Sequence, residues 1–389
     1  MKKKIAILGS TGSIGKTLID IIKKDKNNFE VILLSADKNY KELLKQAKLL
    51  NVKNLILTNP ESFLKIKKYT NSKKIKIFDN FDQFKKIFKK KIDYTMSSIT
   101  GINGLKPTLN IIKYSKKIAI ANKEAIICGW NLIKKKITKY KTIFFPVDSE
   151  HFSIWEILNS KFIPKIEKIY ITASGGPFLN KSINEIEKVT IHQALKHPNW
   201  IMGKKISIDS ATMINKVYEV IEAKNIFNIP YRNIEILIHP KSYIHALIKF
   251  KNGLIKLIAH ETTMKIPIFN TIYSENLKKI KSNKINLYTL NKLNFNIVNN
   301  KRFPVIKLLK LLPEKNSLYE TVIVSANDTL VELFLKEKIK YTDIQKKLIA
   351  IIKKPEFLKF KKIYPKNTKD IIKLNNYVRL NILKNVYKS

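Results

Sequence analysis

The sequence predicts an α/β protein: a parallel sheet covered by helices on both faces, then an α+β region, then a helical C-terminal region. Strand-like and helix-like segments alternate through residues 3–122, which is typical of βαβ units. Hairpin-like strands follow in the middle of the chain, and the C-terminal segments have helical periodicity. With 389 residues, the chain is long enough for two or three domains with separate cores.

The N-terminal segment predicts a cradle for a pyrophosphate group. Residues 3–8 are expected to form a buried strand, 9–15 (GSTGSIG) a tight glycine turn, and 14–24 an amphipathic helix. The glycines let the backbone approach a pyrophosphate, and the free N–H groups at the helix start attract its charge. The spacing is G-x-x-G-x-x-G, and Ser10 stands where a P-loop needs its first glycine. A dinucleotide-binding, Rossmann-like fold is therefore favoured over a P-loop.

Further elements extend this pattern along the chain. Strands are expected at 30–36, 54–59, 74–79, 92–99 and 117–122, with helices at 40–50 and near 61–69. Later strands are expected at 168–173, 234–240 and 244–250, where Asn252-Gly253 predicts a hairpin turn with antiparallel pairing. Helices are expected at 320–339 and 341–354. The predicted domains are 1–150, 151–275, a polar linker at 276–300, and a helical domain at 301–389.

Cysteine usage and hydropathy limit the location of the protein. The single cysteine, Cys128, excludes a disulfide framework within this chain and indicates a reducing compartment, so a cytoplasmic location is expected. Its simplest role is that of a small buried apolar residue. Lys2 to Lys4 lead directly into the first strand and leave no apolar signal segment. No apolar run approaches the roughly 18 residues of a membrane-spanning helix, so we expect no membrane partner.

The net charge of +45 suggests nucleic-acid binding at first sight. Only three of the 75 basic residues are arginines, however, whereas nucleic-acid sites usually use the planar arginine fork. The lysines are also spread along the whole chain instead of forming one stripe. We interpret their excess as drift toward AT-rich codons. We therefore expect attraction of anionic small molecules and no specific nucleic-acid partner.

Two carboxylates in the segment 146–151 (PVDSEH) predict a divalent metal site. If residues 142–146 form a strand, the side chains of Asp148 and Glu150 leave the backbone on the same side. Carboxylates this close repel each other unless a cation lies between them, and Glu219 is a natural third ligand. An all-carboxylate set suits Mg²⁺ or Mn²⁺, whereas the six histidines show no zinc spacing. The alternative is a solvated acidic turn.

The segment 197–219 has the composition of a binding site. A purely structural segment of this length would show a regular apolar stripe, but polar side chains interrupt it at His197, Asn199, Ser207, Asp209, Ser210, Asn215 and Lys216. The simpler alternative is a surface loop followed by a helix whose N-cap is Ser210. The carboxylates upstream favour the binding site.

Six segments, in the right order, resemble the 1-deoxy-D-xylulose 5-phosphate reductoisomerase family. They are GSTGSIG at 9–15, ANKEAI at 121–126, PVDSEH at 146–151, TASGGPF at 172–178, HPNWIMGKKISIDSATMINK at 197–216 and IHPKSYIHALI at 238–248. The resemblance covers nearly the whole chain. It implies a Rossmann-like N-terminal domain, a central catalytic domain that carries the contacts of a homodimer, and a C-terminal helical bundle.

The resemblance also implies a reaction and its cofactors. The family converts 1-deoxy-D-xylulose 5-phosphate to 2-C-methyl-D-erythritol 4-phosphate, the committed step of non-mevalonate isoprenoid precursor biosynthesis. A divalent cation (Mg²⁺, Mn²⁺ or Co²⁺) polarises the carbonyl while a carbon-carbon bond breaks and is remade. The branched aldehyde phosphate then accepts a hydride from NADPH.

Roles for individual residues follow from the same resemblance. The metal ligands would be Asp148, Glu150 and Glu219. The substrate phosphate would be held by Ser174, Ser210, Asn215 and Lys216, and the substrate body would be contacted by Lys123, Ser149, Glu150, His197 and Trp200. The NADPH site would consist of Thr11, Gly12, Ser13, Ile14, Asp37, Lys38, Asn39, Asn122, Glu124 and Gly203. The loop around Met202 and Gly203 would close over the substrate and exclude water. For His197 and Trp200, the sequence alone favours a packed aromatic pair.

Four positions depart from the family pattern. Val217 and Tyr218 stand where the family usually has Gly and Leu, and Asp37 and Lys241 stand where Gly and Gln are usual. Asp37 is the most informative of them, because an acidic residue at the end of the second strand ordinarily accepts the ribose hydroxyls of NAD. Lys38, by contrast, favours the extra phosphate of NADPH.

Two other functional classes stay open at this point. One is a different NAD(P)-dependent dehydrogenase of a phosphorylated or acidic small molecule, which would not need a metal. The other is a non-enzymatic basic binding protein, whose affinity for nucleic acid should survive physiological salt.

Overall fold

The computed structural model describes residues 1–69, 75–160, 162–274 and 278–387, and the chain divides into two compact units that are described separately. The first unit consists of Met1–Ala125, Asn131–Asp148 and Met264–Lys281, and the second of Ile126–Trp130, Ser149–Thr263 and Ser282–Ser389. Some residues of the predicted segments 74–79, 276–300 and 301–389 lie outside the described ranges. The four-part domain division given above remains a prediction.

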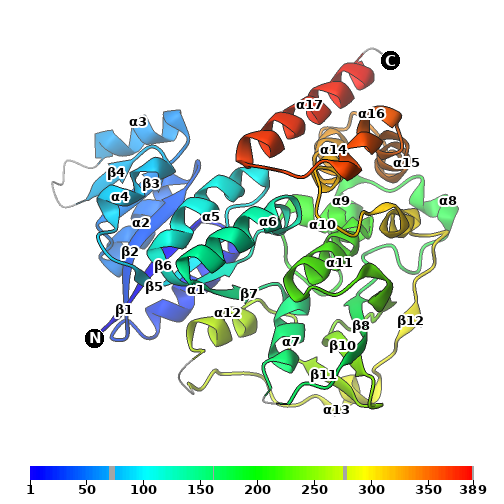
Figure 1. Ribbon diagram of the computed structural model, residues 1–389, viewed down its shortest axis with the longest axis horizontal. Coiled ribbons are helices and arrows are strands. Elements are labelled where there is room, and N and C mark those ends of the chain that lie inside the picture. Colours follow the sequence, from blue (N-terminus) through cyan, green and yellow to red (C-terminus); the bar gives the residue numbers. More distant parts are fainter. Residues whose placement is uncertain (70–74, 161, 275–277, 388–389) are drawn as a thin grey trace. The chain divides into compact units, whose positions relative to one another are not determined.

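Within the described ranges, seven parallel strands form the sheet of the first unit (Figure 1). They are β1 (Lys3–Leu8), β2 (Phe29–Ala36), β3 (Asn54–Leu57), β4 (Lys76–Phe78), β5 (Ile92–Ser97), β6 (Ser115–Ile120) and β7 (Ile143–Pro146). Their order is β4-β3-β2-β1-β5-β6-β7, and all neighbouring pairs are parallel. The direction of strand addition reverses between β1 and β5, and open α/β sheets bind their ligands at the carboxyl ends of such strands. The parallel, Rossmann-like sheet predicted from the alternation is confirmed.

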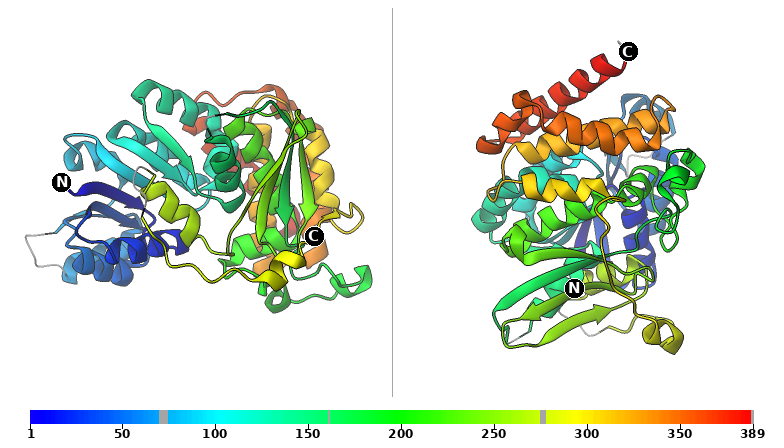
Figure 2. Two further views of the ribbon diagram at one scale, coloured as in Figure 1. Left: turned by 90° about the horizontal axis from the view of Figure 1, so that it is seen from below. Right: turned by 90° about the vertical axis from the view of Figure 1, so that its right-hand side faces the viewer.

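Helices lie on both sides of this sheet (Figure 2). They are α1 (Ser13–Lys23), α2 (Tyr40–Leu50), α3 (Pro60–Tyr69), α4 (Phe84–Ile87), α5 (Leu105–Ile111), α6 (Lys123–Tyr140) and α12 (Lys265–Ile272), with the 3-10 turns η1 (Phe81–Gln83), η2 (Ile102–Gly104) and η3 (Ile112–Tyr114). Helix α1 forms because Leu18, Ile19 and Ile22 recur on one face and are buried together. Helix α12 comes from far along the chain and packs against α1.

The turn between β1 and α1 requires glycine at two positions. Gly9 has a φ of +80°, and a Cβ there would lie 2.7 Å from the carbonyl oxygen of Ser98. At Gly15, a Cβ would lie 2.5 Å from the Cα of Ser10, so the first turn of α1 packs directly on the glycine turn. The predicted order of strand, glycine turn and helix is confirmed.

The second unit contains a mixed sheet of five strands among the described residues. They are β8 (Ile166–Ala173), β9 (Ile234–Ile238), β10 (Ile244–Phe250), β11 (Ile255–Ala259) and β12 (Asn296–Ile297), in the order β11-β10-β8-β9-β12. β8 and β9 are parallel, and the other neighbouring pairs are antiparallel. The predicted hairpin joins β10 to β11, with Gly253 at a φ of +86°. β12 lies in the segment predicted as a linker, so that segment also supplies an edge strand.

Helices of the second unit cover this sheet and continue into the C-terminal region. α7 (Ser149–Leu158) packs against β10 and β11, and α11 (Ile214–Phe227) packs against β8 and β9. The shorter elements are α8 (Ile183–Ile186), α9 (Ile191–Leu195), α10 (Lys204–Ala211), α13 (Leu287–Asn291), η4 (Tyr231–Asn233) and η5 (Pro304–Leu311).

The C-terminal helices confirm the predicted helical bundle (Figure 1). They are α14 (Tyr319–Leu335), α15 (Tyr341–Ile352), α16 (Pro355–Leu358), the 3-10 turn η6 (Lys359–Lys362) and α17 (Thr368–Tyr387). Nearly every residue of α14 is buried, because α10, α15 and α17 all pack against it. No helix in the described part of the chain has the length and apolar character needed to cross a membrane.

Candidate metal and substrate site

The two carboxylates of the PVDSEH segment are positioned by a strand-to-helix junction. β7 ends at Pro146, Asp148 lies in the bend that follows, and α7 begins at Ser149, so Glu150 lies in the first helical turn. The expectation that both side chains leave one strand on the same side is therefore wrong. Only Ser149 separates the two residues in the chain, and a tight junction brings them together instead of strand alternation.

Glu219 approaches the same point from α11. That helix starts after Met213, which has a left-handed φ of +68°, and it carries Glu219 inward to an exposure of 1 %. One carboxylate oxygen each from Asp148, Glu150 and Glu219 lies within 4.8 Å of the others. The structure thus brings together the three acidic residues that the sequence suggests as metal ligands.

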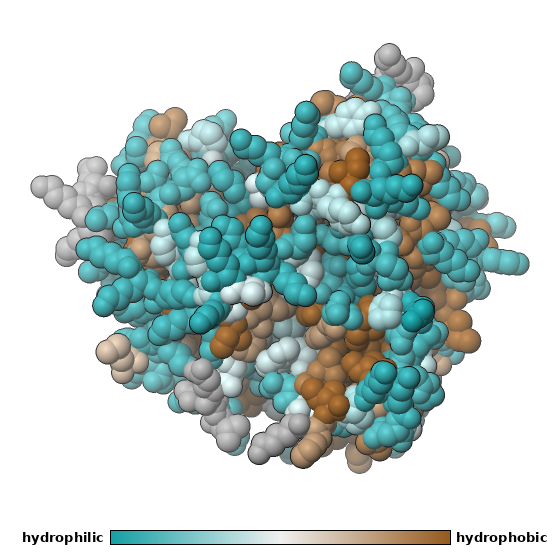
Figure 3. Space-filling view, viewed as in Figure 1, coloured by the Kyte–Doolittle hydropathy of each residue, from teal (hydrophilic) through white to brown (hydrophobic). Residues whose placement is uncertain are grey.

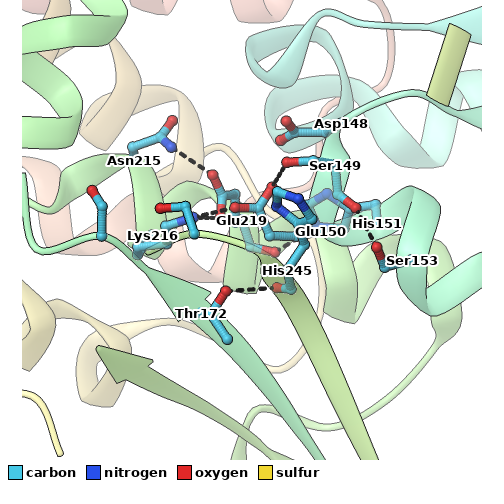
Figure 4. A network of polar contacts seen from close by, with 12 residues as sticks. Asp148, Ser149, Glu150, His151, Ser153, Thr172, Asn215, Lys216, Glu219 and His245 are labelled. Atoms are coloured by element: carbon cyan, nitrogen blue, oxygen red, sulfur yellow. Dashed lines mark hydrogen bonds and ion pairs between the residues drawn. The ribbon is translucent and has the colours of Figure 1, made fainter. Parts of the chain in front are cut away.

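Lys216 lies between two of these carboxylates (Figure 4). Its Nζ donates to Glu150 Oε1 and, at 2.5 Å, to Glu219 Oε2. The opposite oxygens also accept hydrogen bonds, from Ser149 Oγ to Glu150 Oε2 at 2.6 Å and from Asn215 Nδ2 to Glu219 Oε1 at 2.5 Å. Burial lowers the pKa of Lys216, but Glu150 and Glu219 outweigh that effect and leave its pKa above the usual value.

This donor set fits a hard divalent cation. The three side chains offer only oxygen ligands, which Mg²⁺ and Mn²⁺ prefer. Glu150 and Glu219 are exposed by only 7 % and 1 %, and two buried like charges require a cation between or beside them. Asp148 also belongs to a second group of possible ligands, with His151 and Glu222, and that group includes a nitrogen donor.

His197 and Ser174 form a hydrogen-bonded pair next to this cluster. The imidazole Nε2 lies 3.0 Å from Ser174 Oγ, and Nδ1 accepts backbone N–H bonds from Asn199 and Trp200 at 3.1 and 3.0 Å. Because Nδ1 is an acceptor, Nε2 carries the proton and donates. Burial, with a smaller contribution from the Lys216 charge, lowers the pKa of His197 to about 4, so the ring is neutral at physiological pH.

The loop that contains Trp200 connects α9 to α10. Its backbone is irregular from Lys196 to Gly203, and Asn199 Nδ2 ties it to the Pro240 carbonyl oxygen at 2.6 Å. The Trp200 ring contacts His245 edge-on at 6.0 Å between centroids. Trp200 therefore packs on His245, not on His197 as the sequence alone favours.

Ser210 lies in the last turn of α10, so the alternative in which Ser210 caps the start of a helix is wrong. The N-cap of α10 is Gly203. Gly176, two residues after Ser174, has a φ of +67°, and a Cβ there would lie 3.1 Å from the Ser210 carbonyl oxygen. This close approach places the loop after β8 against the end of α10, and hence Ser174 near Ser210.

The residues predicted to bind the dinucleotide in the first unit surround the carboxyl ends of β1 and β5. Thr11, Gly12, Ser13 and Ile14 form the glycine turn and the start of α1. Asn122 caps α6 by accepting from the Ala125 N–H at 2.8 Å, and its amide donates to the carbonyl oxygens of Ile99 and Gly101. Glu124 accepts from the Gly101 N–H at 3.3 Å. Asn122 and Glu124 thus hold the loop after β5, and Lys123 between them donates to Asp148.

Three residues that sequence reasoning missed hold the glycine turn in place. Ser35 Oγ accepts from the Gly9 N–H at 2.9 Å, Ser98 Oγ donates to the Leu8 carbonyl oxygen at 2.8 Å, and Gln46 Nε2 donates to the Ser10 carbonyl oxygen at 3.1 Å. In the sequence, Ser35 is a polar residue inside an apolar strand, Ser98 is one just after a strand, and Gln46 is one on a helix. That signal is too common to identify them.

Asp37, Lys38 and Asn39 follow β2 directly and are exposed. Asn39 caps α2 by accepting from the Glu42 N–H at 3.2 Å. Asp37 accepts from the Thr58 hydroxyl at 2.9 Å. The structure thus places Asp37 where the sequence predicts it, at the end of the second strand. Gly203 lies in the second unit, just before α10.

Sequence comparisons identify the family to which the chain belongs. The family model of 1-deoxy-D-xylulose 5-phosphate reductoisomerase matches residues 5–129. The model of the 1-deoxy-D-xylulose 5-phosphate reductoisomerase C-terminal domain matches residues 144–227, and the model of the DXP reductoisomerase C-terminal domain matches residues 260–381. The chain belongs to the 1-deoxy-D-xylulose 5-phosphate reductoisomerase family. The 1-deoxy-D-xylulose 5-phosphate reductoisomerase of Pelagibacter ubique is 60 % identical over 382 residues, with 98 % of each chain covered. The reductoisomerase of a Sulfurihydrogenibium species is 38 % identical, with 92 % of each covered.

Solved reductoisomerase structures share the fold. The 1-deoxy-D-xylulose 5-phosphate reductoisomerase from Zymomonas mobilis in complex with NADPH is 30 % identical, covers 99 % of both chains and has a TM-score of 0.86. A reductoisomerase in complex with NADPH, fosmidomycin and magnesium is 29 % identical, covers 99 % of this chain and 98 % of its own, and has a TM-score of 0.90.

The departures from the reductoisomerase pattern have local structural explanations at three positions. Val217 is fully buried, and Tyr218 is 1 % exposed with the Lys205 ammonium 5.7 Å from its ring centroid. Both side chains therefore fill the core around α11. Lys241 extends over the ring of Tyr288 at 5.9 Å. None of the three replaces one of the acidic residues or their hydrogen-bond donors.

Proposed function

We propose that this chain catalyses the metal-dependent rearrangement and NADPH-dependent reduction of 1-deoxy-D-xylulose 5-phosphate to 2-C-methyl-D-erythritol 4-phosphate. This is the committed step of non-mevalonate isoprenoid precursor biosynthesis. The observation that carries the proposal is the convergence of three carboxylates beside a set of anion-binding donors, in a chain that belongs to the reductoisomerase family.

Asp148, Glu150 and Glu219 would hold the divalent cation, and magnesium is present in a related structure. When bound, the cation supplies a Lewis acid that polarises the substrate's carbonyl and neighbouring hydroxyl groups. Lys123 is assigned to orient Asp148, to which it donates. Ser149 has the corresponding role for Glu150.

The substrate phosphate is assigned to Ser174, Ser210, Asn215 and Lys216. Hydroxyl and amide donors fix its orientation, and one lysine supplies the charge. His197 would contact the substrate body as a neutral donor, since its Nε2–H already points at Ser174. Trp200 and the loop to Gly203 would cover the substrate and exclude water.

NADPH would bind along the glycine turn and the start of α1, with Asn122 and Glu124 supporting the opposite loop. When bound, it supplies the hydride for the reduction. The free N–H groups at the start of α1 suit its pyrophosphate. Lys38 and Asn39 are assigned to the adenosine end, and Gly203 to the nicotinamide side.

A homodimer in the cytoplasm is part of the same proposal. Leu257, Leu247 and Tyr170 are aligned across β11, β10 and β8 on one face of the sheet, and Leu257 is 44 % exposed. Ile255, on the same face of the edge strand, is 60 % exposed, and Figure 3 shows hydrophobic side chains gathered over this part of the molecule. Exposed apolar side chains grouped on a sheet face are typical of a subunit interface. Light scattering after gel filtration measures the oligomeric state.

The proposed activity is tested by NADPH oxidation with 1-deoxy-D-xylulose 5-phosphate, with and without Mg²⁺ or Mn²⁺. We expect oxidation only when both substrate and metal are present. Oxidation that continues in excess chelator would instead indicate an ordinary NAD(P)-dependent dehydrogenase. A chain that retains nucleic acid at physiological salt and oxidises no NADPH would indicate a basic binding protein.

A further inference from the structure

Lys216 acts as the cation of the acidic cluster in this structure. Its side chain is 9 % exposed, and the side chains of Glu150 and Glu219 are 9 % and 1 % exposed. Two carboxylates this deeply buried are strongly unfavourable without a positive charge beside them. The Lys216 ammonium donates to both and supplies that charge (Figure 4).

A metal ion held by Glu150 and Glu219 would compete with Lys216 for the same two carboxylates. A divalent cation that coordinates both Glu150 and Glu219 would come close to the Lys216 ammonium, and like charges repel strongly in a buried site. Asn215 Nδ2 also donates a hydrogen bond to Glu219 Oε1, and Ser149 Oγ donates one to Glu150 Oε2. All four oxygens of the two carboxylates therefore accept a hydrogen bond from a side chain.

The two side chains that donate hydrogen bonds to Glu219 are also assigned to bind the substrate phosphate. Asn215 and Lys216 are adjacent at the start of α11, and both donate to Glu219. A lysine ammonium is a compact charge on a flexible stem, so Lys216 can turn from the carboxylates to a phosphate. A phosphate that draws Lys216 away leaves two buried carboxylates without their cation. Those carboxylates then have a higher affinity for a divalent ion.

We propose that Lys216 couples the two ligands: metal binding releases Lys216 and Asn215 for the phosphate, and phosphate binding vacates the carboxylates for the metal. This inference rests on the proposed function of the site. Because coupling between two binding equilibria is reciprocal, each ligand raises the affinity of the other by the same factor. The states in which only one of the two ligands is bound are thereby disfavoured.

The test uses Mn²⁺ and inorganic phosphate as probes, with free Mn²⁺ followed by electron paramagnetic resonance. In the unmodified chain, saturating phosphate should lower the Kd for Mn²⁺ by at least about fivefold, the lower end of typical coupling. Lys216→Met should bind Mn²⁺ more tightly than the unmodified chain when phosphate is absent. Phosphate should change its Kd much less than in the unmodified chain, because only Asn215 still links the two ligands. Chloride keeps the ionic strength equal, and titrations without protein correct for Mn²⁺ complexed by phosphate.

Lys224→Met is the matched control, because it removes the same charge from the same helix. Burial lowers the pKa of Lys224, and the nearby charges of Glu320 and Glu314 partly offset that effect. Its Mn²⁺ affinity and phosphate coupling should equal those of the unmodified chain. Phosphate coupling of undiminished size in Lys216→Met, or an unchanged Mn²⁺ affinity in that variant, would overturn the inference.

Glu219→Gln separates this inference from the proposed function. If the carboxylates are metal ligands, this variant should lose most of its Mn²⁺ affinity. If Glu219→Gln loses Mn²⁺ affinity but phosphate does not change the Kd of the unmodified chain, the proposed metal site is supported and the role of Lys216 is rejected. Wild-type Mn²⁺ binding by Glu219→Gln rejects the metal site itself. The wild-type titrations decide the coupling even if a variant fails to fold.

Discussion

The Thr58 hydroxyl donates a hydrogen bond of 2.9 Å to Asp37 Oδ1. The two residues directly follow β3 and β2, and backbone bonds from the N–H groups of Thr58 and Asn59 to the carbonyl oxygens of Ala36 and Asp37 hold the two loops together at 3.2 Å each. An acidic residue at this position ordinarily accepts the ribose hydroxyls of NAD and repels the 2′-phosphate of NADP. Because Thr58 occupies one oxygen of Asp37, that repulsion is partly countered, and Lys38 remains available to attract the phosphate.

We therefore expect NADPH to be preferred over NADH by about ten- to hundredfold. One charge-assisted contact is worth roughly 1.5 to 3 kcal/mol, and about 1.4 kcal/mol corresponds to tenfold. Asp37→Gly should widen the preference, whereas Lys38→Ala should erode it. Thr58→Val should also reduce it, because the Asp37 carboxylate loses its donor. The measurements are the ratio of kcat/KM for the two cofactors and their Kd values by fluorescence. A ratio below one in the unmodified chain would contradict the role given to Lys38.

Replacement of Glu219 by Gln should lower turnover by about two to four orders of magnitude. The change preserves the size of the side chain but removes one charge from the proposed ligand set, and metal catalysis depends on that charge. NADPH should bind with nearly unchanged affinity, because its predicted site in the first unit is built from other residues. Glu235→Gln, at an exposed position on β9, is the control. Turnover above about a tenth of wild type at saturating metal would show that Glu219 is not a ligand.

Residues 197–204 should become protected only when ligands are bound. The segment is irregular up to Gly203, and Ile201 is fully exposed. Apart from its chain neighbours, no atom of the described residues lies within 4 Å of a Cβ built at Gly203, so the backbone there is not tightly packed. Hydrogen exchange in this segment should slow when NADPH and a phosphonate substrate mimic are both present. The buried helix α14 serves as the internal reference, whose exchange should not change. Equal protection of residues 197–204 in the free and bound protein would show that the segment is rigid and does not close over the ligands.

Glu320 should make stability depend on pH. Burial raises the pKa of this carboxyl to about 7, although Ser317 donates to Oε2 at 2.7 and 3.0 Å, and within the described residues Oε1 has no hydrogen-bond partner. The folded chain thus keeps a proton that the unfolded chain releases above its ordinary pKa of 4.5. This contribution is fully present below about pH 4.5 and is lost as the pH rises to about 7, for a total on the order of 3 kcal/mol.

Glu320→Gln should remove that contribution, because the amide is neutral at every pH. The unfolding midpoint in urea is compared at about pH 5 and pH 7.5. The difference between the two pH values should be smaller in the variant than in the unmodified chain and in a Glu235→Gln control. An equal difference in all three proteins would place the ionisation of Glu320 near that of an exposed carboxyl.

The parallel sheet, the glycine turn, the hairpin and the family could all be predicted from the sequence. These features depend on local patterns: apolar periodicity fixes which residues face the core, and glycine or asparagine fixes where the backbone turns. Residues 40–50 and 244–250 form a helix and a strand with the predicted bounds for this reason. The acidic and polar residues of the site were also identifiable, because their types and order match the family along nearly the whole chain.

Contacts between these side chains, by contrast, depend on the tertiary structure. Lys216 donates to Glu150 across 66 residues of chain, and Thr58 reaches Asp37 across 21. Likewise, α12 packs against α1 from the far part of the sequence, and β12 adds an edge strand from a segment that is polar enough to predict a linker. Local patterns encode backbone angles and burial within one element. A contact between distant residues depends on the packing of several elements at once, and a hydrogen bond depends on positions within a few tenths of an ångström, which no spacing in the sequence specifies.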